Sequence, residues 1–153
     1  MQNAITNYCQ AGGNFFVSGA YVASDLWDNR LVKANEEDKK FAMEVLKYKW
    51  RVGQAARNGK VKSVASPFPE ITGSYTYYQD LNPESYVVES PDALEPAAQG
   101  AFTILRYSEN NLSAGIAYKG NYKTCVLGFP FEAIRTVTER ELLMKAILTF
   151  FEH

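Results

Sequence analysis

The sequence predicts an α/β domain in which helices flank a layered β-sheet. Helical and strand-like segments alternate in the first half, three short strands follow one another in the second half, and an amphipathic helix ends the chain. The chain has 153 residues, of which 46% are hydrophobic and 22% are charged, a composition typical of one globular domain. We expect residues 1–153 to form a single α/β domain or a fragment of one.

The first elements follow from periodicity and from helix-end signals. Residues 2–11 carry apolar side chains at helical spacing and run into two glycines, which predicts a short helix. The continuous apolar run at 14–18 is typical of a strand buried on both faces, and residues 20–27 begin a second helix. Asn35 is a good helix cap before three acidic residues, so another helix should follow it. From 50 to 66 the pattern changes to period two, as in strands.

Residues 67–100 form an irregular, proline-rich excursion. Its prolines leave room for only short strands, which we place at 75–78 and 86–89. The segment also holds the acidic residues Glu84, Glu89, Asp92 and Glu95. Paired carboxylates can perform glycosidic acid–base chemistry and carboxylate oxygens can bind calcium. Acids in a proline-rich loop are more often simply solvated, so we expect these side chains to face water.

Three strands should follow, at 101–107, 112–118 and 122–127. The two connections contain Asn and Gly, which accept positive φ and so favour hairpins.

The last helix carries the clearest cap signal. Thr138 and Glu141 have capping-box spacing, with Val137 and Leu142 as the hydrophobic staple. The predicted buried stripe is Leu142, Leu143, Ala146, Ile147, Phe150 and Phe151.

One feature of this order is unusual for a doubly wound sheet, because the chain begins with a helix rather than a strand. Two interpretations stay open. The chain is the C-terminal part of a larger domain, or it is a small α/β protein with a mixed sheet.

Composition excludes several classes of protein. The net charge is −1, and the one local basic cluster, Lys47 to Lys62, is too dilute for an extended phosphate-binding stripe, so we expect no nucleic-acid partner. No apolar run is long enough for a membrane span, and the first residues lack the basic start and apolar core of a signal peptide. Cys9 and Cys125 lack metal-type spacing. A disulfide and free thiols both stay open, and free buried cysteines are favoured because each lies in an apolar periodic segment. We expect no metal and no cofactor.

The first candidate site lies where residues 14–18 end in Ser18-Gly19 and turn towards a helix. Ligands of α/β sheets bind at the carboxyl ends of strands, and Asp25 on the following helix could face the same crevice. A serine nucleophile would need glycine two residues before and after it and a basic partner. The neighbours are Phe16 and Ala20, and the only histidine is His153, so Ser18 is a binding candidate rather than a nucleophile.

The second candidate site follows the strand at 122–127. Gly128-Phe129-Pro130 forms a turn, with Glu132 and Arg135 close to the strand end. If this strand and 14–18 are parallel neighbours, Ser18, Asp25 and Glu132 approach one another and form a sugar- or cation-binding crevice. The alternative is structural, with Phe129 filling the core.

Long stretches of the chain resemble one bacterial group. The resemblance is carried by GGNFFVSGAYVASDL, FAMEVLKYKWRVGQAARNGKVKSV, ESYVVESPDALEP, RYSENNLSAGIAYKG and VLGFPFEAI with the final helix. These segments are similar to large secreted proteins labelled xanthan lyases, with golvesin-like or fibronectin-like modules. The resemblance implies a class I glutamine-amidotransferase-like domain of flavodoxin type, outside the cytoplasm and beside other modules.

The chain departs from that family at every catalytic position. Amidotransferases of this fold use a cysteine at a strand-to-helix elbow with His and Glu partners, whereas Cys9 lies in a predicted helix and Cys125 inside a predicted strand. The resemblance therefore implies the scaffold without its catalytic groups.

Three hypotheses about function follow. The first is a non-catalytic domain of a secreted polysaccharide-related protein, which binds carbohydrate or organises neighbouring modules. The second is a polysaccharide lyase or hydrolase that uses carboxylates and tyrosine. The third is a structural domain that associates with a second copy of itself.

Overall fold

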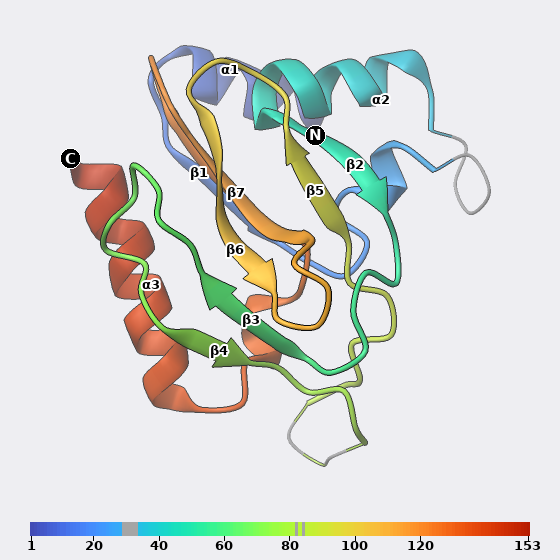
Figure 1. The fold of residues 1–153 in the computed structure, drawn as a ribbon. Coiled ribbons are helices and arrows are strands. Elements are labelled where there is room, and N and C mark those ends of the chain that lie inside the picture. The colour runs from blue at the N-terminus through green and yellow to red at the C-terminus, as the bar shows by residue number, and fades with distance from the viewer. Residues whose placement is uncertain (29–33, 82, 84) are drawn as a thin grey trace.

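A six-stranded β-sheet forms the centre of the molecule, in a computed structural model that describes residues 1–28, 34–81, 83 and 85–153 (Figure 1). The strand order is β1-β8-β7-β6-β3-β4, and a separate two-stranded ribbon pairs β2 with β5. The strands are β1 (Phe15–Ser18), β2 (Tyr48–Val52), β3 (Lys60–Ser63), β4 (Ser74–Thr76), β5 (Ala93–Pro96), β6 (Ala101–Tyr107), β7 (Ser113–Lys119) and β8 (Lys123–Leu127).

The helices lie on both faces of this sheet. They are α1 (Gln2–Gln10), α2 (Glu36–Phe41), which continues as the π-helix η2 (Ala42–Leu46), and α3 (Val137–Glu152), with short 3₁₀ turns η1 (Ser24–Leu26) and η3 (Phe131–Ala133). None of the helices in the described part of the chain is long and apolar enough to cross a membrane.

The predicted flavodoxin- and amidotransferase-like layered α/β fold is wrong. Only β1 and β8 pair in parallel, and every other pairing in both sheets of the described chain is antiparallel. The physical reason lies in the connections after β6 and β7. Parallel neighbours need a crossover of a dozen or more residues, but the turns at Asn111 and Gly120 return the chain at once. A mixed sheet was expected only under the second of the two interpretations left open by the sequence, that of a small α/β protein.

Two apolar layers hold the sheet in place, and β8 contributes to both. Cys125 and Leu127 of β8 face α3, where Leu143, Ala146, Ile147 and Phe150 are buried. Val126, between them, faces the opposite layer with Cys9 of α1, residues of α2 and η2, and Leu94 of β5. The alternation follows from the period of two along a strand and leaves β8 covered on both sides.

Most of the elements expected from periodicity are present. The helices at 2–11 and after Asn35, and the strands at 14–18, 101–107, 112–118 and 122–127, are confirmed to within two residues. Asn35 caps α2 in a capping box with Asp38. Residues 20–27 form only a turn and η1, the segment 86–89 is not a strand, and β5 was not predicted.

The cap of the last helix is Thr136 with Glu139, two residues before the predicted pair. Both pairs have the same spacing, so local sequence cannot separate them. Starting the helix at Val137 buries Leu143 and Ile147, while Leu142, which the prediction placed in the core, is 58% exposed. Cys9 and Cys125 are free and buried, which is the favoured of the two alternatives that the sequence left open.

Candidate functional site

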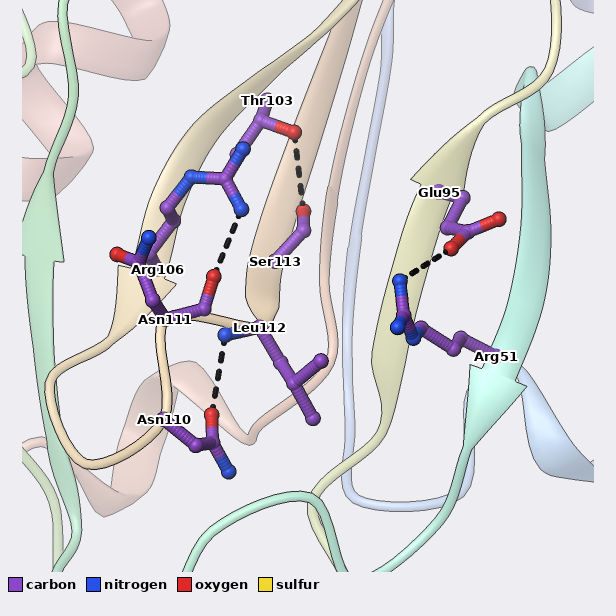
Figure 2. Close-up of polar contacts among 8 residues, drawn as sticks. All are labelled: Arg51, Glu95, Thr103, Arg106, Asn110, Asn111, Leu112 and Ser113. Atoms are coloured by element: carbon purple, nitrogen blue, oxygen red, sulfur yellow. Dashed lines mark hydrogen bonds and ion pairs between the residues drawn. The ribbon is translucent and has the colours of Figure 1, made fainter.

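An open polar groove of about 550 Å³ lies between the β2–β5 ribbon and the strands β6 and β7 (Figure 2). Its volume falls in the range of small-ligand sites. The groove is lined by Arg51, Leu94, Glu95, Pro96, Thr103, Arg106, Asn110, Asn111, Leu112 and Ser113.

The groove exists because the ribbon covers only part of the sheet. Strand β5 packs across β7, which buries Leu94 against Ile116 and Val126. Strand β6 lies one place further along the sheet, and its outward side chains Thr103 and Arg106 remain half-buried. The edge of the ribbon is therefore one wall of the groove, and β6 with the start of β7 is its floor.

Arg106 is the central charged residue on this floor. Strand register places it beside Lys62 of β3 on one side and Ser113 of β7 on the other. Its Nη1 donates a hydrogen bond of 2.7 Å to the carbonyl oxygen of Asn111, a residue held in the left-handed region at φ 64°. The turn thus holds the guanidinium by one N–H group.

Arg51 and Glu95 form an ion pair on the opposite wall, with 2.7 Å between Nη1 and Oε1 (Figure 2). Arg51 stands at a β-bulge between Trp50 and Val52, and such irregularities re-aim a side chain. Both side chains are about half exposed, so the pair stabilises the fold by less than about 1 kcal/mol. Breaking this ion pair therefore costs little free energy, so Arg51 or Glu95 can bind a ligand instead.

Neutral polar groups complete the lining. The hydroxyl of Thr103 donates to that of Ser113 at 3.2 Å. Asn110 is fixed at both ends of its amide, because its oxygen accepts from the N–H of Leu112 and its nitrogen donates to the carbonyl of Ala55. Hydroxyl, amide, guanidinium and carboxylate groups together match the hydrogen-bonding needs of a polyhydroxylated ligand.

The described residues contain no group of three or more His, Cys, Asp or Glu side chains able to hold a metal ion. The groove itself contributes one carboxylate, Glu95, within its described lining.

The first predicted site has the expected strand arrangement. Strands β1 and β8 are parallel neighbours, and Ser18 lies beside Leu127 at their carboxyl ends. The hydroxyl of Ser18 accepts a 3.1 Å hydrogen bond from the backbone N–H of Phe131, and the N–H of Gly19 donates to the carbonyl of Leu127. These bonds tie the two strand ends together. Asp25 is exposed on η1, and no described contact joins it to Ser18 or Glu132.

The second predicted site is divided between core and surface. Phe129 is buried and stacks on Tyr77 with 5.0 Å between ring centroids. Glu132 is exposed and accepts a 2.7 Å hydrogen bond from Tyr86, whose pKa rises to about 12 through burial and that bond. Arg135 is exposed, with Asp80 3.5 Å away. None of these residues lines the groove, and they remain binding predictions.

No pattern in the sequence indicates the role of Asp92, and the prediction that it faces water with Glu89 and Glu95 is wrong. Asp92 is completely buried immediately before β5. One carboxylate oxygen accepts from the N–H groups of Ala23 and Ser24 at 2.9 Å and from the Ser24 hydroxyl, and the other accepts from the Trp50 indole at 3.0 Å. Glu84, the remaining acid of that segment, lies outside the described residues.

The backbone of Asp92 is bound as tightly as its side chain. Its N–H donates to the carbonyl of Gly128 at 2.7 Å, and its own carbonyl accepts from the Tyr107 hydroxyl at 2.7 Å. Burial raises the pKa of the Asp92 carboxyl to about 6, against the lowering effect of its four hydrogen bonds. Because Asp92 leads directly into β5, this junction fixes the wall of the groove.

Comparison with known proteins shows a likeness of fold. No family model matches the chain. No curated protein sequence matches it. Among solved structures, the fold is similar to part of a β-galactosidase from Rahnella sp. R3, with a TM-score of 0.62 and 13% identity over 99% of this chain and 20% of that one. The chain therefore spans about a fifth of that enzyme's length, and the likeness is one of fold.

Proposed function

We propose that the chain is a carbohydrate-binding domain of a larger, extracytoplasmic, polysaccharide-related protein, and that the groove is where the saccharide binds. The lining of the groove carries this proposal. It combines two hydroxyls, two asparagines, two guanidinium groups and a carboxylate around a volume suited to a small sugar. Oriented donors and acceptors of this kind are what a saccharide needs in place of water.

Binding is favoured over hydrolysis because of the number and state of the carboxylates. Glycosidases use two carboxyl groups on either side of the bond that they cleave. The described lining of the groove offers a single carboxylate, that of Glu95. Asp92, the carboxyl with the raised pKa, is fully buried and bonded to four donors.

Two further observations support the carbohydrate assignment. The fold is similar to a part of a β-galactosidase, a protein that acts on a sugar. The sequence also resembles secreted proteins labelled xanthan lyases, which is the support for a polysaccharide-related parent and for a location outside the cytoplasm.

A glycan array with neutral and acidic oligosaccharides, followed by calorimetry on the best ligand, tests the proposal. We expect binding that the groove variant Thr103→Val weakens severalfold, because it keeps the side-chain shape and removes one hydroxyl. Lys119→Gln, an exposed residue at the far end of β7 that does not line the groove, should bind as the wild type does. Failure to bind any glycan on the array, or equal binding by the wild type and both groove and control variants, would remove the groove from the proposal.

A second candidate function, self-association, is favoured by the outer face of α3. Val137, Leu142 and Leu148 are 59%, 58% and 53% exposed on this one helix. Glu141 and Lys145 lie one turn apart there, so two copies of α3 packed antiparallel can exchange reciprocal ion pairs. Sedimentation of the wild type and of Leu148→Lys separates the two candidates, because a dimer through α3 should dissociate in the variant while glycan binding is retained.

A further inference from the structure

The charge pattern of the groove points to the chemical class of its ligand, an inference that rests on the proposed carbohydrate-binding function. We propose that the groove recognises an acidic saccharide, a uronic acid residue whose carboxylate is bound by Arg106 with Lys62 beside it. The sugar hydroxyls then form hydrogen bonds with Thr103, Ser113, Asn110 and Asn111.

The first observation is a pair of like charges held side by side. Strand register sets Lys62 of β3 directly opposite Arg106 of β6, and opposed like charges destabilise a sheet. Neither side chain has an ion-pair partner among the described residues. Glu109, the carboxylate nearest to Arg106 in sequence, is bound instead by the backbone N–H groups of Arg57 and Asn58. A bound anion would remove this repulsion.

The second observation is the unused hydrogen-bonding capacity of Arg106. Its guanidinium carries five N–H donors, and its one described bond uses Nη1 and the carbonyl of Asn111. This bond fixes the orientation of the fork and leaves donors for a planar, two-oxygen acceptor. A carboxylate is such an acceptor, and guanidinium–carboxylate pairs are among the strongest charge-assisted hydrogen bonds.

The opposite wall limits how much negative charge the ligand carries. Glu95 contributes a carboxylate 2.7 Å from Arg51, so the lining holds a single surplus positive charge, that of Arg106. A polyphosphate would bring several negative charges against Glu95. A sugar with one carboxylate in the groove balances the charge and uses the neutral groups for its hydroxyls.

Two matched ligands test the inference by calorimetry, tri-galacturonic acid and its full methyl ester, which have the same sugar chain and differ in that a methyl group replaces the negative charge of each carboxylate. We expect the acid to bind about tenfold more tightly than the ester, the effect of one charged hydrogen-bonded contact. Arg106→Gln should abolish this preference, and Lys62→Gln should reduce it. Lys119→Gln, which removes a positive charge outside the groove, should leave it unchanged.

The outcomes separate this inference from the function on which it rests. Equal affinity for acid and ester, or a preference that survives in Arg106→Gln, would overturn the acidic-ligand inference and leave neutral glycan binding intact. Free galacturonate as a competitor shows whether the sugar carboxylate alone suffices or whether the chain of sugars is needed, and acetate binding as well as galacturonate would also overturn the inference. Thermal unfolding of Arg106→Gln should show little change in stability, because the substitution removes both the repulsion from Lys62 and the hydrogen bond to Asn111, so lost binding cannot be assigned to misfolding.

Discussion

The Asp92 junction and the groove are neighbouring polar regions that differ in how their charges are satisfied. At the junction the buried carboxylate of Asp92 accepts four hydrogen bonds. The backbone of the same residue makes two more, with Gly128 and Tyr107. In the groove, Arg106 has one described bond and stands opposite Lys62. A polar group that is buried and fully bonded stabilises the fold, whereas an under-bonded charge on an open surface is available to a ligand. The predictions below test this difference, beginning with the largest effect.

Asp92→Ala should lower the free energy of unfolding by about 4 kcal/mol. The substitution leaves the N–H groups of Ala23 and Ser24 and the indole of Trp50 buried without their acceptor. Urea unfolding measures the change. Asp25→Ala, which removes an exposed carboxylate from the adjacent 3₁₀ turn, is the control and should change stability by less than about 0.5 kcal/mol. Similar small losses in both variants would contradict a structural role for the junction.

Stability should also depend on the protonation of Asp92. Its pKa in the folded protein is about 6, above the value in the unfolded chain, so between about pH 4 and pH 6 the folded state holds a proton that the unfolded state has lost. The stability contributed by this group is thus fully present below pH 4 and is lost as the pH rises to 6, by about 3 kcal/mol. Urea unfolding across this range, compared with Asp92→Asn, isolates the effect. A variant with the same pH profile as the wild type would show that Asp92 does not titrate there.

Gly128→Ala should cost about 2 kcal/mol. A Cβ at this position would lie 2.0 Å from the carbonyl oxygen of Asp92, so the strand end and the junction would have to move apart. At the end of the neighbouring strand, Gly19→Ala meets nothing closer than 3.6 Å and should be nearly neutral. Thermal unfolding of the two variants gives the comparison, and equal melting temperatures would argue against the close approach.

The smallest expected effect is in the groove. Lys62→Gln should stabilise the fold by about 0.3 kcal/mol at low salt, because it relieves repulsion with Arg106, and the gain should disappear in 1 M salt. Lys49→Gln, a lysine opposite Glu95 in β2, should not be stabilising. Urea unfolding at both salt concentrations tests the sign, and a loss of stability in Lys62→Gln would mean that the lysine has a favourable structural contact.

Local patterns predicted many elements of this fold because their signals lie within a few residues. Glycine after helical periodicity ended α1, Asn35 and Asp38 capped α2, and the Asn- and Gly-containing turns predicted the hairpins of β6, β7 and β8. The parallel pairing of β1 with β8, which was stated from the sequence only as a condition, is present. The flavodoxin-like arrangement was wrong because it came from resemblance and helix–strand alternation, while the short hairpins already required antiparallel neighbours.

The groove was not predicted because its residues are ordinary in sequence. Arg51, Glu95 and Arg106 come from three separate strands, and two of these belong to a ribbon, β2–β5, whose pairing bridges the proline-rich segment. Asp92 carried no signal that distinguished it from Glu89 or Glu95, although one is fully buried and the others are exposed.

The sequence by itself determined most of the local elements of this protein, including its final amphipathic helix. Turn, cap and periodicity signals act over a few residues and need no partner. Only the tertiary structure decided which acid is buried, which of two overlapping capping boxes begins α3, and which charges meet across the sheet. Those outcomes depend on strand register and on desolvation, which arise only when distant segments pack together.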